Sequence, residues 1–203
     1  MKLYSFSGSC GLATNIVLAW IDQPYEVQMI EKDDLQKPEM RKLNPLGKVP
    51  ILDIDGWVLY ENASILNYLA EKHPESQLNG DGTLSSNAEV HRWLAVINSD
   101  VHPAYKPLFG ATAYLDDDAA IDKTKAHARE EVRGYFEILD AQLANQDWLA
   151  DTRSIADAYL FVLLMWAGFV KVDTAGLNNL QRFEQRMKAD DGVQRALKEQ
   201  KLG

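Results

Sequence analysis

The first 30 residues show three different patterns of apolar and polar positions. An apolar stretch over residues 3–6 predicts a short strand. The next apolar positions recur at helical spacing and predict a helix: Leu12, Ile16, Val17 and Trp20. The third group alternates with polar residues, as in an edge strand with one face in water: Tyr25, Val27 and Met29. A strand, a helix and a strand at such short spacing predict a right-handed parallel crossover.

A pair of strands is predicted between residues 51 and 60. Two apolar runs, 51–54 and 57–60, are separated by Asp55-Gly56. An Asp-Gly pair favours a type I′ turn, because both central residues of that turn need a positive φ. The two strands are therefore expected to form an antiparallel hairpin.

Val49-Pro50 stands directly before this hairpin. Proline has no N–H to donate to a neighbouring strand, and X-Pro is the peptide bond whose cis form costs least. We therefore predict a cis bond here, which would turn the Val49 N–H and C=O toward an extended ligand. Helices are predicted on both sides of the hairpin, one around residues 35–43 and one beginning at Glu61-Asn62.

Helical spacing dominates the chain from Leu84 onward, where no strand pattern is found. Pro103 is expected to interrupt the helix that carries the first apolar face, which is formed by Val90, Leu94, Ile97, Val101, Tyr105 and Leu108. The second face is formed by Ile121, Ala128, Val132, Tyr135, Leu139 and Leu143. Residues 154–157 (SIAD) form a capping-box pattern before the almost entirely apolar run 158–170. Two shorter helices are predicted around 180–187 and 193–197.

The change from a mixed to an all-helical pattern divides the chain. We predict an α/β domain over residues 1–75, a polar, glycine-containing linker over 76–83, and an all-α domain over 84–203. A chain of 203 residues is long enough for each domain to have a core. The run 158–170 is shorter than the roughly 20 residues that a membrane span needs, so no membrane association is expected.

Charge and cysteine content narrow the possible partners. The net charge of −9 argues against nucleic acid or an anionic membrane as a partner, since both require a basic face. A small anionic ligand held by local dipoles is still compatible with it. The single cysteine, Cys10, excludes an internal disulfide and a thiolate-rich zinc site, so no metal is expected. No signal peptide is recognisable, and we expect a cytoplasmic location.

Three segments together resemble the cytosolic glutathione S-transferases: NPLGKVP over residues 44–50, Glu61-Asn62, and SIADAYLF over residues 154–161. The opening MKLYSFSGSCGLATNI and His102 are similar to the bacterial beta class. The resemblance covers essentially the whole chain and implies the glutathione transferase fold, an α/β thioredoxin-like N-terminal domain plus an all-α C-terminal domain. It also implies a homodimer that conjugates reduced glutathione to small hydrophobic electrophiles.

Cys10 and His102 are the first candidates for catalysis. Cys10 lies where the first strand turns into the first helix, and the positive end of that helix is expected to favour a thiolate. A lone cysteine is otherwise most often a small buried apolar residue. By resemblance, His102 faces Cys10 across the domain cleft, where it could support a thiolate or shuttle a proton near neutral pH. Tyr4 and Ser9 compete with Cys10, because other classes use a tyrosine or serine near the end of the first strand.

The resemblance also implies which residues bind glutathione. The backbone around Val49 and Pro50 would pair with the cysteinyl part of the ligand. Glu61 would complement the ligand's amine, and the helix N-terminus at Asn62 would hold its γ-glutamyl carboxylate. The alternative role for Asn62 is helix capping alone. The glycyl carboxylate needs a cation, for which there are two candidates: Lys32 and Lys48.

Two departures from the family pattern keep other functions open. Asn62 replaces the usual serine or glycine, and Ala95 stands where the beta class commonly has an asparagine. One alternative is thiol-disulfide exchange through Cys10, by a mixed disulfide with glutathione because Ser7 replaces the first cysteine of a dithiol motif. The other is a non-catalytic binding or regulatory protein on the same fold. Tyr105 and Trp166 could line the electrophile pocket, although core packing is the stronger explanation for both.

Overall fold

The computed structural model describes residues 1–202. Its N-terminal part follows the predicted order: β1 (Lys2–Ser5), α1 (Gly11–Trp20), β2 (Glu26–Met29), α2 (Pro38–Leu43), β3 (Ile51–Ile54), β4 (Trp57–Tyr60) and α3 (Asn62–Lys72). The sheet has the strand order β2-β1-β3-β4, with β1 parallel to β2 and antiparallel to β3. The predicted mixed sheet, with β2 at its edge, is confirmed.

The β3-β4 hairpin has the turn that the Asp-Gly pair predicts. Asp55 has φ 55° and Gly56 has φ 93°, and Ile54 pairs with Trp57 across the turn. Both central residues thus have the positive φ of a type I′ turn.

The predicted helix over 35–43 is divided in the structure, which corrects that prediction. A 3₁₀ helix covers Lys32–Gln36, and α2 begins only at Pro38. Lys37 between them is extended, with ψ 146°, because the ring of a following proline disfavours helical backbone at the preceding residue.

The C-terminal part is helical, as predicted. It contains α4 (Leu84–Val96), α5 (His102–Ala104), α6 (Asp118–Gln142), α7 (Ile155–Val170), α8 (Asn178–Lys188) and α9 (Asp191–Glu199). The expected interruption before Pro103 is a π-helical segment, Ile97–Val101, which places His102 at the first position of α5. Within residues 1–202, no helix combines the length and the apolar character needed to cross a membrane.

Helix α7 is the centre of the all-α domain. Most of its side chains are buried, and the predicted capping box is present at its start. The Asp157 carboxylate accepts hydrogen bonds from the N–H of Ser154 at 2.8 Å, the N–H of Leu149 at 2.9 Å and the Ser154 hydroxyl at 2.7 Å. This buried carboxylate therefore fixes both the start of α7 and the loop before it.

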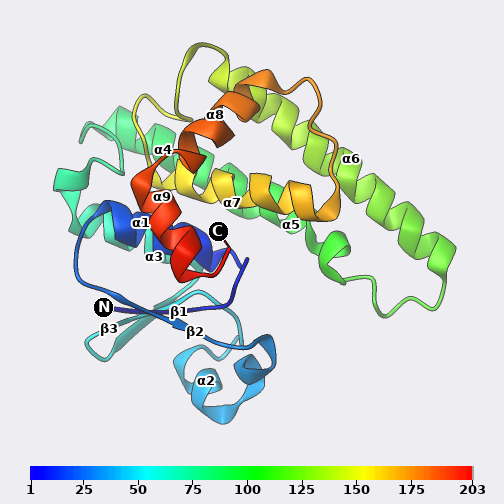
Figure 1. Cartoon of the computed structure of the whole chain (residues 1–203), viewed down its shortest axis with the longest axis horizontal. Helices are drawn as coiled ribbons and strands as arrows, with labels where there is room; N and C mark the ends of the chain where they lie inside the picture. Colours follow the sequence, from blue (N-terminus) through cyan, green and yellow to red (C-terminus); the bar gives the residue numbers. More distant parts are fainter. Residues whose placement is uncertain (203) are drawn as a thin grey trace.

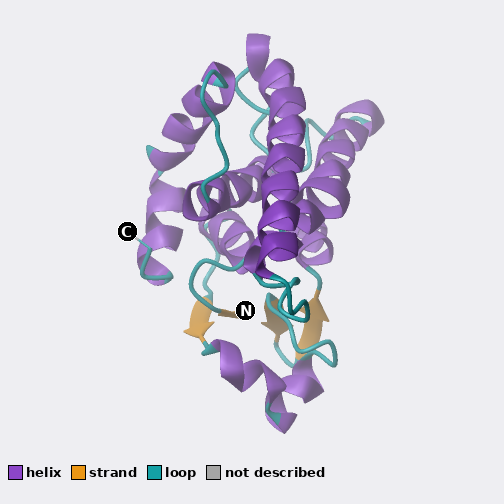
Figure 2. Ribbon diagram, turned by 90° about the vertical axis from the view of Figure 1, so that its right-hand side faces the viewer, coloured by secondary structure: helices purple, strands orange, loops and turns teal. Residues whose placement is uncertain are grey.

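Helices of the two domains pack against each other on one side of the sheet. Figure 2 shows the strands between the helical domain on one side and the α2 segment on the other. Helix α1 packs against α3, α7 and α9. Helix α1 therefore joins the sheet domain to the helical domain.

Helix α9 returns to the start of the chain and lies beside α1 (Figure 1). The Trp20 indole N–H donates to Asp190 at 2.7 Å, and the Asn15 amide donates to Glu199 at 2.8 Å. In addition, the Ser7 hydroxyl donates to the backbone C=O of Gln200 at 2.8 Å. Residues 190–200 are thus part of the support for the loop that leads to Cys10.

Candidate active site

The Val49-Pro50 bond is cis, as predicted, and it lies opposite the start of α1. Cys10 is the N-cap residue of α1, and its Sγ–H donates to the Val49 C=O at 3.8 Å. The Val49 N–H has no hydrogen-bond partner within residues 1–202. This point therefore offers an extended ligand one backbone donor beside a cysteine.

Burial opposes the predicted thiolate at Cys10. Burial raises the pKa of the thiol to about 12. A backbone hydrogen bond at Cys10 lowers this pKa, Glu61 raises it and Lys48 lowers it, but burial is the largest effect. The helix N-terminus is thus outweighed by loss of water, and at neutral pH Cys10 is a thiol that can donate a hydrogen bond.

His102 is hydrogen-bonded through Nδ1 to the hydroxyl of Tyr159. Its ring also lies edge-on to Trp166, with the ring centroids 4.9 Å apart. Burial, followed by the charges of Lys106 and Lys48, lowers the pKa of His102 to about 4. The imidazole is therefore neutral near pH 7, so it can act as a hydrogen-bond partner but not as a positive charge for a thiolate.

Tyr159 is a site residue that the sequence interpretation did not single out. It is fully buried on α7. Burial raises its pKa well above the usual value, Cys10 and Glu61 add to this effect, and Asn62 opposes it. Tyr159 thus lies among His102, Cys10 and Asn62. The available signal was a hydroxyl within an apolar helix, since a buried tyrosine usually needs a polar partner.

Glu61 and Asn62 form the start of α3. Glu61 is the N-cap residue and has φ 72°, a conformation that costs a non-glycine residue about 1–3 kcal/mol. Asn62 is only 4% exposed; its Oδ1 accepts a hydrogen bond from Thr14 Oγ1 at 2.8 Å, while its Nδ2 lies near Tyr159, whose pKa the Asn62 side chain lowers, without a full hydrogen bond within residues 1–202. Asn62 is the first residue of α3 rather than its N-cap, and no side chain among the described residues caps this helix, so capping as the sole role of Asn62 is wrong.

The other predicted residues differ in their placement. Lys48 is exposed, and its charge acts on both Cys10 and His102. The Ser9 hydroxyl lies 2.9 Å from the Ser5 hydroxyl and accepts the Gly11 N–H, so it supports the start of α1.

Tyr4 and Lys32 are not connected to this group. Tyr4 alternates with the buried side chains of Leu3 and Ser5 on β1, and Lys2 Nζ lies 5.3 Å from its ring centroid. Lys32 is exposed at the start of the 3₁₀ helix and forms no ion pair within the described residues. The structure thus brings together Cys10, Lys48, Val49, Pro50, Glu61, Asn62 and His102, whose roles stay predictions.

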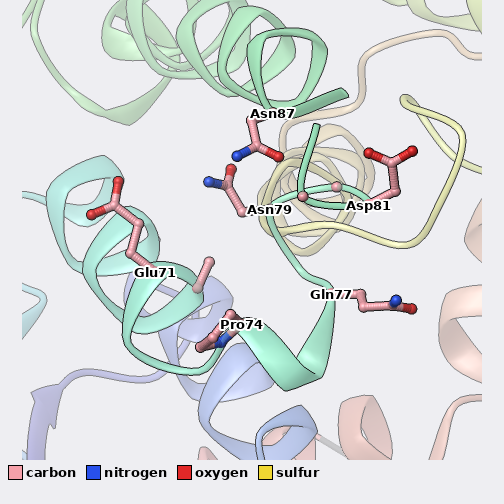
Figure 3. Close-up of a pocket in the computed structure, with 9 residues that line it drawn as sticks. Glu71, Pro74, Gln77, Asn79, Asp81 and Asn87 are labelled. Carbon is pink, nitrogen blue, oxygen red and sulfur yellow. The ribbon is translucent and has the colours of Figure 1, made fainter. Parts of the chain in front are cut away.

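Two cavities lie near the junction of the domains. One, of about 390 Å³, is lined by His102, Lys106, Phe109, Gly110 and Ala111. The other, of about 360 Å³, lies between the end of α3, the linker and α4 (Figure 3), and no predicted site residue lines it. Of the two, only the first cavity is lined by a residue of the predicted site, His102.

Comparisons with known proteins agree with this arrangement. Residues 3–77 match the family model for the glutathione S-transferase N-terminal domain, and residues 89–191 match the C-terminal domain. Glutathione S-transferase GST-4.5 of Xanthomonas campestris is 48% identical over 203 residues, which cover all of both chains. The structure of a glutathione S-transferase from Xylella fastidiosa has a TM-score of 0.97 and 45% identity, covering 100% of this chain and 99% of that one.

The beta class is also represented among the similar structures. A bacterial beta class glutathione S-transferase of Sphingomonas chungbukensis has a TM-score of 0.88 and 31% identity, with 100% of both chains covered. The resemblance drawn from the three sequence segments is confirmed. The chain belongs to the glutathione S-transferase family.

Proposed function

We propose that this glutathione transferase holds reduced glutathione along Val49-Pro50 and the start of α3, and presents its sulfur to a small hydrophobic electrophile. The observation that carries the proposal is the unused Val49 N–H beside Cys10. A second donor, the buried Nδ2 of Asn62, lies at the start of α3 near Tyr159. A peptide with an extended backbone and a terminal carboxylate fits such donors.

Each part of glutathione has a proposed partner. The Val49 backbone pairs with the cysteinyl residue, and Asn62 with the first N–H groups of α3 holds the γ-glutamyl carboxylate. Glu61 pairs with the ligand's amine. Lys48, whose charge acts at Cys10, is the better placed of the two lysines for the glycyl carboxylate.

Cys10 acts on the bound sulfur as a hydrogen-bond donor in this proposal. A protonated Cys10 and the N-terminus of α1 both favour the anionic form of the glutathione thiol. Lowering the pKa of that thiol from about 9 to about 7 requires about 2–3 kcal/mol of selective stabilisation. The raised pKa of Cys10 itself disfavours thiol-disulfide exchange, which needs an attacking thiolate.

Titration of the bound thiol tests this role of Cys10. We expect ultraviolet absorbance of the thiolate to show a pKa about 2 units below that of free glutathione. Cys10→Ala should raise the bound pKa by about 1 unit, because it removes one donor to an anion, and Cys10→Ser should retain the low value. An unchanged pKa in the unaltered protein would remove the mechanism.

Tyr159 is proposed as a positioning residue that acts through His102. Its hydroxyl holds Nδ1 of the neutral imidazole, which orients the ring at the edge of the cavity. We expect Tyr159→Phe to lower kcat about tenfold without changing KM for glutathione, because the loss of one hydrogen bond loosens the ring. Steady-state kinetics at saturating electrophile measure both quantities.

Tyr105→Phe is the matched control for that variant. It also removes a buried hydroxyl, which here donates to the Leu163 C=O at 2.7 Å, but it leaves the His102 contact unchanged. Both variants should lose about 1 kcal/mol of stability. An equal fall of kcat in the two variants would assign a merely structural role to Tyr159.

A homodimer and a cytoplasmic location are further proposals, which rest on the family. Sedimentation velocity of the purified protein distinguishes a dimer from a monomer.

A further inference from the structure

The cavity beside His102 has an aromatic wall. Phe109 is 49% exposed and lies edge-on to Trp166, with ring centroids 5.0 Å apart. It also stacks on Tyr105, with centroids 5.8 Å apart and an interplanar angle of 16°, and the Tyr105 and Trp166 rings contact each other. Because Tyr105 and Trp166 are buried, they hold Phe109 in place and leave its ring for a ligand.

Lys106 lies at the same cavity, three residues before Phe109. Both belong to a 3₁₀ helix, Lys106–Phe109, that ends at Gly110 with φ 96°. Side chains three apart in such a helix lie on the same side. The ammonium group and the aromatic ring are therefore presented together to the same space.

The charge of Lys106 is not neutralised by a neighbouring acid. Within residues 1–202, Lys106 forms no ion pair, and it is the one lysine or arginine that lines this cavity. Its charge also reaches His102, whose pKa it lowers. The cavity is thus locally positive in a chain whose net charge is −9.

We propose that this pocket selects aromatic electrophiles that carry an anionic group such as a carboxylate. The ring of the substrate would lie on Phe109, and the anion would pair with Lys106. The inference rests on the proposed function, because it concerns the second substrate of the same reaction. For an aryl halide, the glutathione thiolate forms the new carbon–sulfur bond, the halide leaves with its bonding electrons, and the thiol proton passes to solvent.

Two glutathione conjugates test the selectivity without requiring turnover. The probes are S-(4-carboxy-2,6-dinitrophenyl)glutathione and its uncharged carboxamide, measured by calorimetry at pH 7 and low salt. We expect the carboxylate to bind about fivefold more tightly, as for a solvent-exposed ion pair. The preference should shrink as salt screens the charges.

Variants of Lys106 locate the effect. Lys106→Met keeps an apolar stem of similar length and should abolish the preference, while Lys106→Glu should reverse it. Lys188→Met is the control, since it removes the same charge from α8, where no residue lines the cavity. Circular dichroism checks that each variant is folded.

The outcomes separate this inference from the function on which it rests. Equal affinity for the two conjugates, or a preference that survives in Lys106→Met, would overturn the anion selectivity and leave glutathione binding intact. Failure of the unaltered protein to bind both conjugates and glutathione itself would overturn the proposed function and the selectivity with it.

Discussion

The Glu61→Gln variant is expected to bind glutathione about 30-fold more weakly than the unaltered enzyme. Glu61 is the N-cap residue of α3, and its charge affects the pKa values of Cys10 and Tyr159. It therefore lies near the residues that we propose bind glutathione. Glutamine retains the shape of the side chain and removes its charge. The loss of one charge-assisted hydrogen bond to the ligand's amine corresponds to about 2 kcal/mol.

The Glu61→Gln substitution should mainly raise KM for glutathione. Glu61 raises the pKa of Cys10, so its neutralisation does not weaken the support of the bound sulfur. We therefore expect kcat to stay within about twofold when glutathione is saturating, as for loss of uniform binding. Calorimetry and steady-state kinetics give the two values.

Glu71→Gln is the matched control, because it makes the same change in the last turn of α3, beside the linker cavity. It should leave the affinity for glutathione unchanged. If Glu61→Gln bound glutathione as tightly as this control, the assignment of Glu61 to the amine would have to be abandoned.

Replacing Asp157 with alanine should lower the free energy of unfolding by about 4 kcal/mol. Three donors would lose their acceptor: the N–H groups of Leu149 and Ser154 and the Ser154 hydroxyl. Each unsatisfied buried donor costs about 1–3 kcal/mol. Burial raises the pKa of Asp157 to about 6, so part of the cost is offset by removing a carboxylate that is itself desolvated.

Urea unfolding followed by circular dichroism at pH 7 measures this loss. Asp157→Asn retains one acceptor oxygen and should lose about half as much stability. Asp151→Ala, at an exposed position in the preceding loop, should change the free energy of unfolding by less than about 0.5 kcal/mol. A loss below about 1 kcal/mol in Asp157→Ala would show that the loop and α7 do not depend on this carboxylate.

Local signals predicted most of the fold. The hairpin at Asp55-Gly56, the cis bond at Val49-Pro50 and the capping box at Ser154 each depend on a few neighbouring residues. The division of the helix predicted over 35–43 also has a local cause, since Pro38 restricts the backbone of Lys37. The apolar periodicity continues through the 3₁₀ helix and α2 and therefore predicted one helix. It gives no sign of the single extended residue, Lys37, between them.

The protonation states of the site could not be predicted in the same way. The position of Cys10 at the start of α1 correctly indicates the helix N-terminus, which favours a thiolate. It does not indicate how much water the helical domain removes, and burial decides the pKa of both Cys10 and His102. Tyr159 was missed for a related reason: its contact with His102 spans 57 residues of sequence and lies within a helix whose pattern predicts only core.

The hydrogen bonds between the first residues of the chain and residues 199–200 have a consequence for folding during synthesis. The ribosome completes the loop before Cys10 long before it reaches Glu199 and Gln200, which accept hydrogen bonds from Asn15 and Ser7. A nascent chain that stops short of α9 therefore lacks part of the support for its first domain.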